Sequence, residues 1–138
     1  CGTAAIAQGR LAYTNFLNTF SGPRWEALAE RGARVQRPLW ASTGTKNPAY
    51  SDVLYVDELI GPHTVNTVPE PTLDAFLDHG SSARTVDRDL AETSAILDRL
   101  SQANIDLDDV AEKLEREGLA SFEASFDEVI AALVEKAG

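Results

Sequence analysis

The sequence predicts an α/β protein with a parallel β-sheet, to which this chain contributes only some of the strands. Two short apolar runs, residues 35–42 and 63–68, have the character of buried strands, and helical patterns precede, separate and follow them. Strands that alternate with helices favour a parallel sheet with right-handed crossovers. Because two strands do not make a stable sheet in water, we expect further strands to lie upstream or on another chain.

The first half of that pattern begins with two helices. The first covers residues 4–20, with Gly9 as its weak point. Its predicted apolar face follows steps of three and four and comprises Ala5, Gln8, Leu11, Ala12, Phe16 and Phe20. The second helix follows Ser21 as its N-cap, carries Pro23 in its first turn and ends at Gly32.

The strands come next. Residues 35–42 form an apolar run suited to a strand covered on both faces, with Pro38 near its start, where a missing N–H matters least. A short helix capped by Ser51 and stopped by Gly61 separates this run from residues 63–68, which are β-branched and bounded by prolines.

The remainder of the chain is predicted to be helical. One helix ends at Gly80, a polar loop covers residues 81–85, and a helical tail occupies residues 86–138. We predict three tail helices, over residues 87–104, 106–118 and 119–138. The last of them places Leu119, Phe122, Phe126, Val129, Ile130 and Leu133 on one face.

The amino-acid composition limits the classes of protein to which this chain can belong. The chain has 138 residues, 43% of them hydrophobic, which suits one domain or part of a larger one. It has no methionine and begins at Cys1, so we expect the C-terminal part of a longer protein. A single cysteine fits a reducing, cytoplasmic setting, and no apolar run approaches the roughly 18 residues of a membrane span.

Charge is distributed unevenly. Residues 1–69 hold 6 Lys and Arg against 5 Asp and Glu, a net charge of +1, whereas residues 70–138 hold 6 against 17, a net charge of −11. The acidic half argues against binding to nucleic acid or to an anionic membrane, and we interpret it as a solvated helical surface. An anionic ligand should therefore bind in the first half.

The loop after the first strand is the strongest candidate site. Ligands of βα proteins bind at the carboxyl ends of strands, and residues 42–48 occupy such an end. Ser42 and Thr43 offer hydroxyls, and the glycine that follows them lets the backbone approach a ligand closely. Lys46 supplies a point charge suited to phosphate, and Asn47 supplies amide donors. The residues thus predict a phosphate or phosphosugar site.

Other interpretations of this loop stay open at the level of residue types. It does not have the P-loop spacing, and an ordinary polar loop after a strand would look similar. Lys46 could also form a Schiff base, but that role needs a lowered pKa from a desolvated pocket or a neighbouring cation. In the polar surroundings of Gly-Thr-Lys-Asn-Pro, phosphate binding by an ordinary charged lysine is favoured.

The remaining polar residues give weaker signals. His63 and His79 are 16 residues apart and lack ligand-like spacing, so no metal site and no cofactor are predicted. His79 is expected at the end of a helix, near the helix dipole. Asn66 and Thr67, near the end of the second strand, could face a site or point between the sheet and a helix.

The stretch RPLWASTGTKNPAYSDVLYVDELIGPHTVNTVPEPTLDAFLDHG, residues 37–80, closely resembles the C-terminal barrel segment of transaldolases in the branch with longer chains. Trp-Ala-Ser-Thr-Gly, Lys-Asn-Pro and Val-Asn-Thr occur in it in the order and at the spacing of that family. The resemblance continues to EGLASFEASFDEVIAAL, residues 117–133, and so covers essentially the whole chain.

This resemblance implies that residues 1–138 are the C-terminal portion of a single (β/α)₈ TIM barrel of the class I aldolase type, with extra C-terminal helices. Residues 35–42 and 63–68 would be its last two strands. It also implies the transfer of a dihydroxyacetone unit from sedoheptulose 7-phosphate to glyceraldehyde 3-phosphate in the pentose phosphate pathway. The partners would be phosphosugar substrates and the N-terminal part of the same barrel; the oligomeric state does not follow.

The family's phosphate contacts are a serine followed by a basic residue and an asparagine, which match Ser42, Lys46 and Asn47. Other branches have a shorter loop with arginine directly before the asparagine, and lysine cannot make arginine's bidentate contact. The Schiff-base lysine and the acid–base carboxylates of the family belong to upstream strands, so we expect no catalytic residue in this chain. The alternatives are a non-catalytic phosphosugar-binding fragment and a helical interaction fragment.

Overall fold

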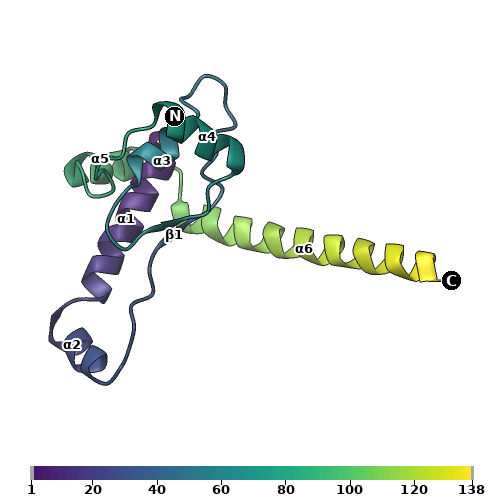
Figure 1. Cartoon of the computed structure of the whole chain (residues 1–138), viewed down its shortest axis with the longest axis horizontal. Helices are drawn as coiled ribbons and strands as arrows, with labels where there is room; N and C mark the ends of the chain where they lie inside the picture. Colours follow the sequence, from purple (N-terminus) through teal and green to yellow (C-terminus); the bar gives the residue numbers. More distant parts are fainter. Residues whose placement is uncertain (1, 138) are drawn as a thin grey trace. The chain divides into compact units, whose positions relative to one another are not determined.

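The computed structural model describes residues 2–137 and divides into two compact units, one up to Leu97 and one from Asp98 onward. The first unit contains α1 (Thr3–Thr19), α2 (Gly22–Glu30), β1 (Leu39–Trp40), α3 (Leu54–Glu58), β2 (Val65–Asn66) and α4 (Glu70–His79) (Figure 1). Helix α5 (Leu90–Gln102) crosses the boundary, and α6 (Leu107–Ala137) belongs to the second unit.

The sheet is parallel, as the sequence predicts. Strands β1 and β2 pair with Leu39 opposite Val65 and Trp40 opposite Asn66. The Val65 N–H donates to the Pro38 carbonyl at 2.9 Å, and the Thr67 N–H donates to the Trp40 carbonyl at 3.0 Å. These bonds show that the two strands are parallel, and each strand lies within one of the two predicted runs.

The strands are, however, much shorter than expected. Each has two residues instead of the predicted spans 35–42 and 63–68. The extended conformation of the first run ends at Ser42, which has a φ of +55°. Leu39 is 54% exposed, so the expectation of a strand covered on both faces is wrong for the described residues. A two-stranded ladder offers nothing to cover the second face.

The core of the first unit lies between α1, the end of α3 and the segment before α5. Its buried members are Ile6, Tyr13, Phe16, Leu59 and Val86, and Phe20, Trp40, Leu54 and Tyr55 pack against them. Val86 is fully buried although the sequence places it at the start of the helical tail. The Tyr13 hydroxyl donates to the Pro62 carbonyl at 3.1 Å, and the Trp40 indole N–H donates to the Leu59 carbonyl at 3.0 Å.

Helix α1 forms where it is predicted but buries a different face. Its buried residues are Ile6, Ala7, Arg10, Tyr13 and Phe16. Of the predicted face only Phe16 is buried, and Leu11 is 51% exposed. Arg10 explains the error, because its guanidinium Nη2 lies 2.7 Å from Glu58 Oε2 and the pair brings a charged residue onto the core face. A purely apolar pattern cannot detect a face of that kind.

The helices around the strands lie in the predicted regions, but α3 is shorter than expected and ends at Glu58 instead of continuing to Gly61. Ser21 holds the N-cap position of α2, although its hydroxyl donates to the Asn18 carbonyl and makes no cap hydrogen bond. Val53, and not the predicted Ser51, holds the N-cap position of α3; Ser51 Oγ accepts the Val53 N–H at 3.3 Å in the turn before the helix. Helix α4 ends at His79, with Gly80 as its C-cap.

The second unit contains one long helix where the sequence predicts two. Helix α6 has 31 residues and continues through Gly118, the predicted boundary. A glycine inside a helix costs only about 1 kcal/mol relative to alanine, which the flanking turns can offset. The face predicted for its second half is exposed at every position: Leu119, Phe122, Phe126, Val129, Ile130 and Leu133.

Candidate functional site

The three predicted site residues all lie on the exposed loop that follows β1. Ser42, Lys46 and Asn47 are each exposed, and Ser42 has a left-handed backbone conformation with a φ of +55°. This φ turns the chain away from the strand direction directly after β1. The three side chains make no hydrogen bond or ion pair with one another within the part of the chain that the structure describes.

Asn47 is partly engaged in local structure. Its side-chain Oδ1 accepts the Ala49 N–H at 3.0 Å, and its carbonyl accepts the Tyr50 N–H at 3.1 Å. Such an Asx turn fixes the amide plane through its oxygen. The side-chain NH₂ group of Asn47 keeps its capacity to donate, which is the capacity that a phosphate would use.

A buried hydrogen bond ties this loop to the end of the neighbouring strand. Thr43 is 4% exposed, and its hydroxyl donates to Asn66 Oδ1 at 2.8 Å. The bond joins the residues at the carboxyl ends of β1 and β2. Asn66 therefore reaches the loop after β1.

The loop also packs closely against the start of α4. A Cβ atom on Gly44 would lie 3.0 Å from the Thr72 hydroxyl and 3.6 Å from a ring carbon of Pro69. The sequence suggests that this glycine permits close approach of a ligand, whereas in the structure it permits close approach of a helix. Thr45 Oγ1 is buried and has no hydrogen-bond partner among the described residues.

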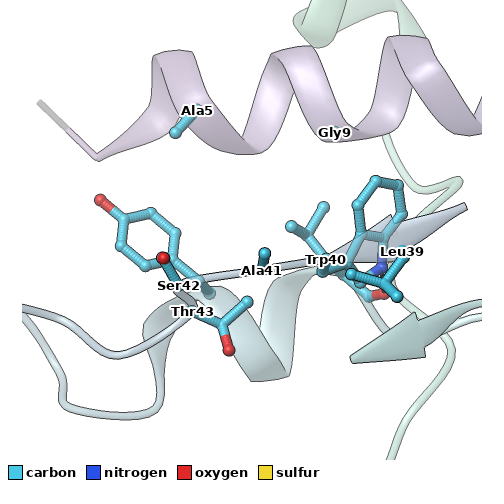
Figure 2. Close-up of a pocket in the computed structure, with 9 residues that line it drawn as sticks. Ala5, Gly9, Leu39, Trp40, Ala41, Ser42 and Thr43 are labelled. Carbon is cyan, nitrogen blue, oxygen red and sulfur yellow. Dashed lines mark hydrogen bonds between the residues drawn. The ribbon is translucent and has the colours of Figure 1, made fainter. Parts of the chain in front are cut away.

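A groove of about 380 Å³ lies between α1 and the segment that contains β1 (Figure 2). It is lined by Ala5, Gly9, Leu39, Trp40, Ala41, Ser42, Thr43, Tyr55 and Leu59. Of the three predicted site residues, Ser42 lines this groove, whereas Lys46 and Asn47 are not among the described residues that line it. The lining is mostly apolar, so the groove does not itself have the character of a phosphate site.

A histidine links the far end of the loop to α4. His79 Nε2 lies 2.8 Å from Asp52 Oδ1, and His79 Nδ1 lies 3.1 Å from Asp78 Oδ2. The hydrogen bond with Asp52, followed by that with Asp78, raises the pKa of His79, and the same contact lowers the pKa of Asp52. His79 is the last residue of α4, as predicted from the sequence.

Residues 2–137 bring together no group of three or more His, Cys, Asp or Glu side chains that could hold a metal ion. Within the same residues, none of the helices has the length and apolar character needed to cross a membrane.

Sequence reasoning identified the loop but missed the contact that anchors it. The amino-acid pattern predicts Thr43 only as a further hydroxyl after the strand, and Asn66 only as a residue near the end of the second strand. The available signal was that two polar residues sit at the carboxyl ends of adjacent parallel strands, where their side chains can meet.

Comparison with known proteins gives a consistent result. The model of the family described as Transaldolase/Fructose-6-phosphate aldolase matches residues 2–133. The chain is 53% identical over 131 residues to a transaldolase of Acidothermus cellulolyticus, an alignment that covers 94% of this chain and 35% of that protein. It is 51% identical over 136 residues to a transaldolase of Saccharopolyspora erythraea, covering 98% of this chain and 37% of the relative.

A transaldolase of Mycobacterium tuberculosis is 51% identical over 131 residues, which is 94% of this chain and 35% of that protein. The chain therefore spans about a third of the length of the curated relatives that it matches. It corresponds to their C-terminal part.

Proposed function

Because this chain belongs to the Transaldolase/Fructose-6-phosphate aldolase family, we propose that it forms part of a transaldolase. The proposed reaction transfers a dihydroxyacetone unit from sedoheptulose 7-phosphate to glyceraldehyde 3-phosphate through a Schiff-base intermediate. The observation that carries this proposal is about 50% identity to proteins named transaldolase across nearly the whole chain. In the proposal, a (β/α)₈ barrel is completed by the part of the relatives that this chain does not span.

The proposed role of this chain is to bind the substrate phosphate. Ser42, Lys46 and Asn47 share one exposed loop at the carboxyl end of a parallel strand, which is where βα proteins bind ligands. The Thr43–Asn66 hydrogen bond and the contact of Gly44 with α4 support this role, because they hold the base of the loop. A held loop loses less conformational entropy on binding than a free one.

The proposed Schiff-base lysine lies outside this chain. Lys46 is exposed and sits among polar residues, whereas an imine-forming lysine needs an environment that lowers its pKa. The exposed ammonium of Lys46 is suited instead to a charge-assisted hydrogen bond with a phosphate oxygen.

A chimera tests the proposal. This chain would replace the matched segment of the Acidothermus cellulolyticus transaldolase, joined to the portion of that protein that precedes the segment, here called the preceding portion. The chimera should transfer the dihydroxyacetone unit between phosphosugars, and the preceding portion alone should not. Borohydride trapping with substrate should label a lysine of the preceding portion.

Two outcomes would contradict the proposal. A folded chimera without transfer activity would show that this chain cannot serve the reaction, which leaves a non-catalytic fragment. A stable reduced adduct on Lys46 would make the loop the covalent site and would remove its phosphate-binding role.

A further inference from the structure

Helix α4 contacts the loop that follows β1 near both ends of the loop. At the start of α4, a Cβ atom on Gly44 would lie 3.0 Å from a side-chain hydroxyl of the helix. At the end of α4, His79 Nε2 lies 2.8 Å from Asp52 Oδ1. Lys46 and Asn47 lie in the sequence between these two contacts. The helix therefore holds the segment that carries two of the three proposed phosphate contacts.

Two consecutive turns connect Asp52 to Asn47. The Asn47 side chain accepts the Ala49 N–H at 3.0 Å, and the Asn47 carbonyl accepts the Tyr50 N–H at 3.1 Å. The side chain and the carbonyl of Ser51 then accept the backbone N–H groups two and three residues later, at 3.3 and 3.2 Å. Asp52 lies inside this second turn. Because such turns restrict the backbone between them, a displacement of Asp52 also moves Asn47.

The two hydrogen bonds of the His79 ring require it to be doubly protonated. Its Nε2 faces Asp52, and its Nδ1 lies 3.1 Å from Asp78 Oδ2. Ionised carboxylates only accept hydrogen bonds, so both ring nitrogens must donate, which only the imidazolium can do. On deprotonation one carboxylate loses its donor, and the remaining bond is no longer assisted by the charge of the ring. The contact with Asp52 is therefore strongest in the protonated state.

The charges around His79 favour that state. Asp52 belongs to the turn before α3 and Asp78 to α4, and no lysine or arginine of the described residues forms an ion pair with either carboxylate. Asp57 of α3 accepts the Ser81 N–H at 2.9 Å, which places a third carboxylate beside the end of α4. The hydrogen bond with Asp52, followed by that with Asp78, raises the pKa of His79 and moves its titration toward neutral pH.

We propose that His79 in its imidazolium form is a positioning residue for the loop that follows β1, and that the affinity of this loop for the substrate phosphate falls as the ring deprotonates. With a neutral ring, the segment around Asn47 has more conformations to lose on binding. The side chains of His79 and Asp52 are 47% and 62% exposed, so the expected effect is small, about two- to fivefold in KM. This inference deepens the proposed function and rests on it for the identity of the ligand.

Steady-state kinetics of the chimera with sedoheptulose 7-phosphate, between about pH 5.5 and pH 8.5, tests the proposal. His79→Gln has no titrating ring, so it should raise KM by about two- to fivefold at the acidic end and approach the unchanged chimera at the alkaline end. The kcat should stay the same if the phosphate contact is equal in the ground and transition states. Titration of the substrate phosphate is common to both proteins, so the ratio of their KM values isolates His79.

Three further variants serve as a parallel test and as controls. Asp52→Asn should reproduce the effect of His79→Gln, because it removes the charge that His79 contacts on the loop side. Asp78→Asn should change KM less, because Asp78 lies on the same helix as His79 and does not link that helix to the loop. His63→Gln replaces the other histidine of the chain and should behave like the unchanged chimera at each pH. Turnover of dihydroxyacetone, which has no phosphate, should be the same in all of them.

Amide hydrogen exchange followed by NMR gives a readout that does not depend on activity. The Ala49 and Tyr50 N–H groups both donate to Asn47 and report on the order of the loop. At about pH 5.5 their protection should fall by about two- to fivefold in His79→Gln. The Thr67 N–H, which belongs to the strand ladder, is the internal reference and should keep its protection.

The proposal is overturned if the ratio of KM between His79→Gln and the unchanged chimera does not vary with pH, or if Asp78→Asn acts as strongly as Asp52→Asn. Unchanged protection of Ala49 and Tyr50 in His79→Gln would equally overturn it. Failure of the proposed function looks different. A folded chimera with the expected loss of protection but without transfer activity would refute the proposed function and leave the positioning of the loop by His79 standing.

Discussion

Lys46 is the residue on which the proposed substrate contact depends. A charge-assisted hydrogen bond to phosphate contributes on the order of 1.5–3 kcal/mol, so Lys46→Ala in the chimera should lower kcat/KM by roughly 10- to 150-fold. The loss should appear mainly in KM if the contact is equal in the ground and transition states. Steady-state kinetics with phosphorylated and unphosphorylated donors measures it.

Lys46→Arg is the matched variant and should retain much of the activity, because it keeps the charge. The unphosphorylated donor dihydroxyacetone should react nearly as before with either variant. Equal losses of kcat/KM for both donor types would refute phosphate binding by Lys46. The loop would then have only a structural role in the barrel.

Thr43 and Thr45 allow a comparison within one loop. Thr43→Val leaves Asn66 Oδ1 without its donor and should lower the free energy of unfolding by about 1–3 kcal/mol. Thr45→Val removes a buried hydroxyl that has no partner among the described residues, so it should cost little or nothing. Denaturant unfolding of the chimera measures both, and equal effects would mean that the Thr43–Asn66 bond does not anchor the loop.

His79 should respond to pH through its two carboxylate neighbours. Its folded pKa is raised, so its contribution to stability is fully present below the ordinary pKa of 6.5 and is lost as pH rises through the folded pKa. The lowered pKa of Asp52 has the opposite sign: that contribution is present above about 3.8 and is lost at more acidic pH.

An NMR titration of the His79 ring tests these directions. Asp52→Asn should lower the pKa of His79 more than Asp78→Asn does, because the bond to Asp52 is the larger cause. An unchanged titration in Asp52→Asn would mean that the link between α4 and the loop does not form in solution.

At the scale of elements, the two helical glycines should behave in opposite ways. A Cβ atom on Gly118 would meet nothing within 4 Å, so Gly118→Ala should stabilise α6 by about 1 kcal/mol. A Cβ atom on Gly9 would lie 2.8 Å from Leu59 Cδ2, so Gly9→Ala requires the core residue Leu59 to shift and should destabilise α1. Thermal unfolding followed by circular dichroism compares them, and a loss of helix in Gly118→Ala would contradict the continuous helix.

The same elements show what the sequence can and cannot predict. Parallel pairing and the end of α4 follow from local patterns, and the structure confirms both. The buried face of α1 does not, because Arg10 enters it through a contact with Glu58, 48 residues away. The continuity of α6 does not follow from the pattern either, because a glycine such as Gly118 can end a helix or lie inside one.

The candidate site was predictable to a similar degree. The position of Ser42, Lys46 and Asn47 on one loop after a strand follows from the pattern of the chain. The hydrogen bond between Thr43 and Asn66 depends on the register of the two strands, which the amino-acid pattern does not specify.

For the molecule as a whole, the chain on its own should be helical but loosely packed. Its sheet has two residues in each strand, and large apolar side chains such as Leu39 and Phe122 are exposed. Far-UV circular dichroism should show helix, while near-UV signals from the two tryptophans should be weak. Addition of the preceding portion should strengthen them. A sharp thermal transition of the chain as a monomer would contradict this expectation.

The pairing of Arg10 with Glu58 constrains how this chain can diverge. The Arg10 side chain is 10% exposed, and Glu58 is the acceptor that compensates its burial. Loss of the acceptor would leave a buried charge alone, which is far more costly than exchanging both residues for apolar ones. Positions 10 and 58 should therefore covary among homologous sequences. A substitution at one position should be retained only where the other position has also changed.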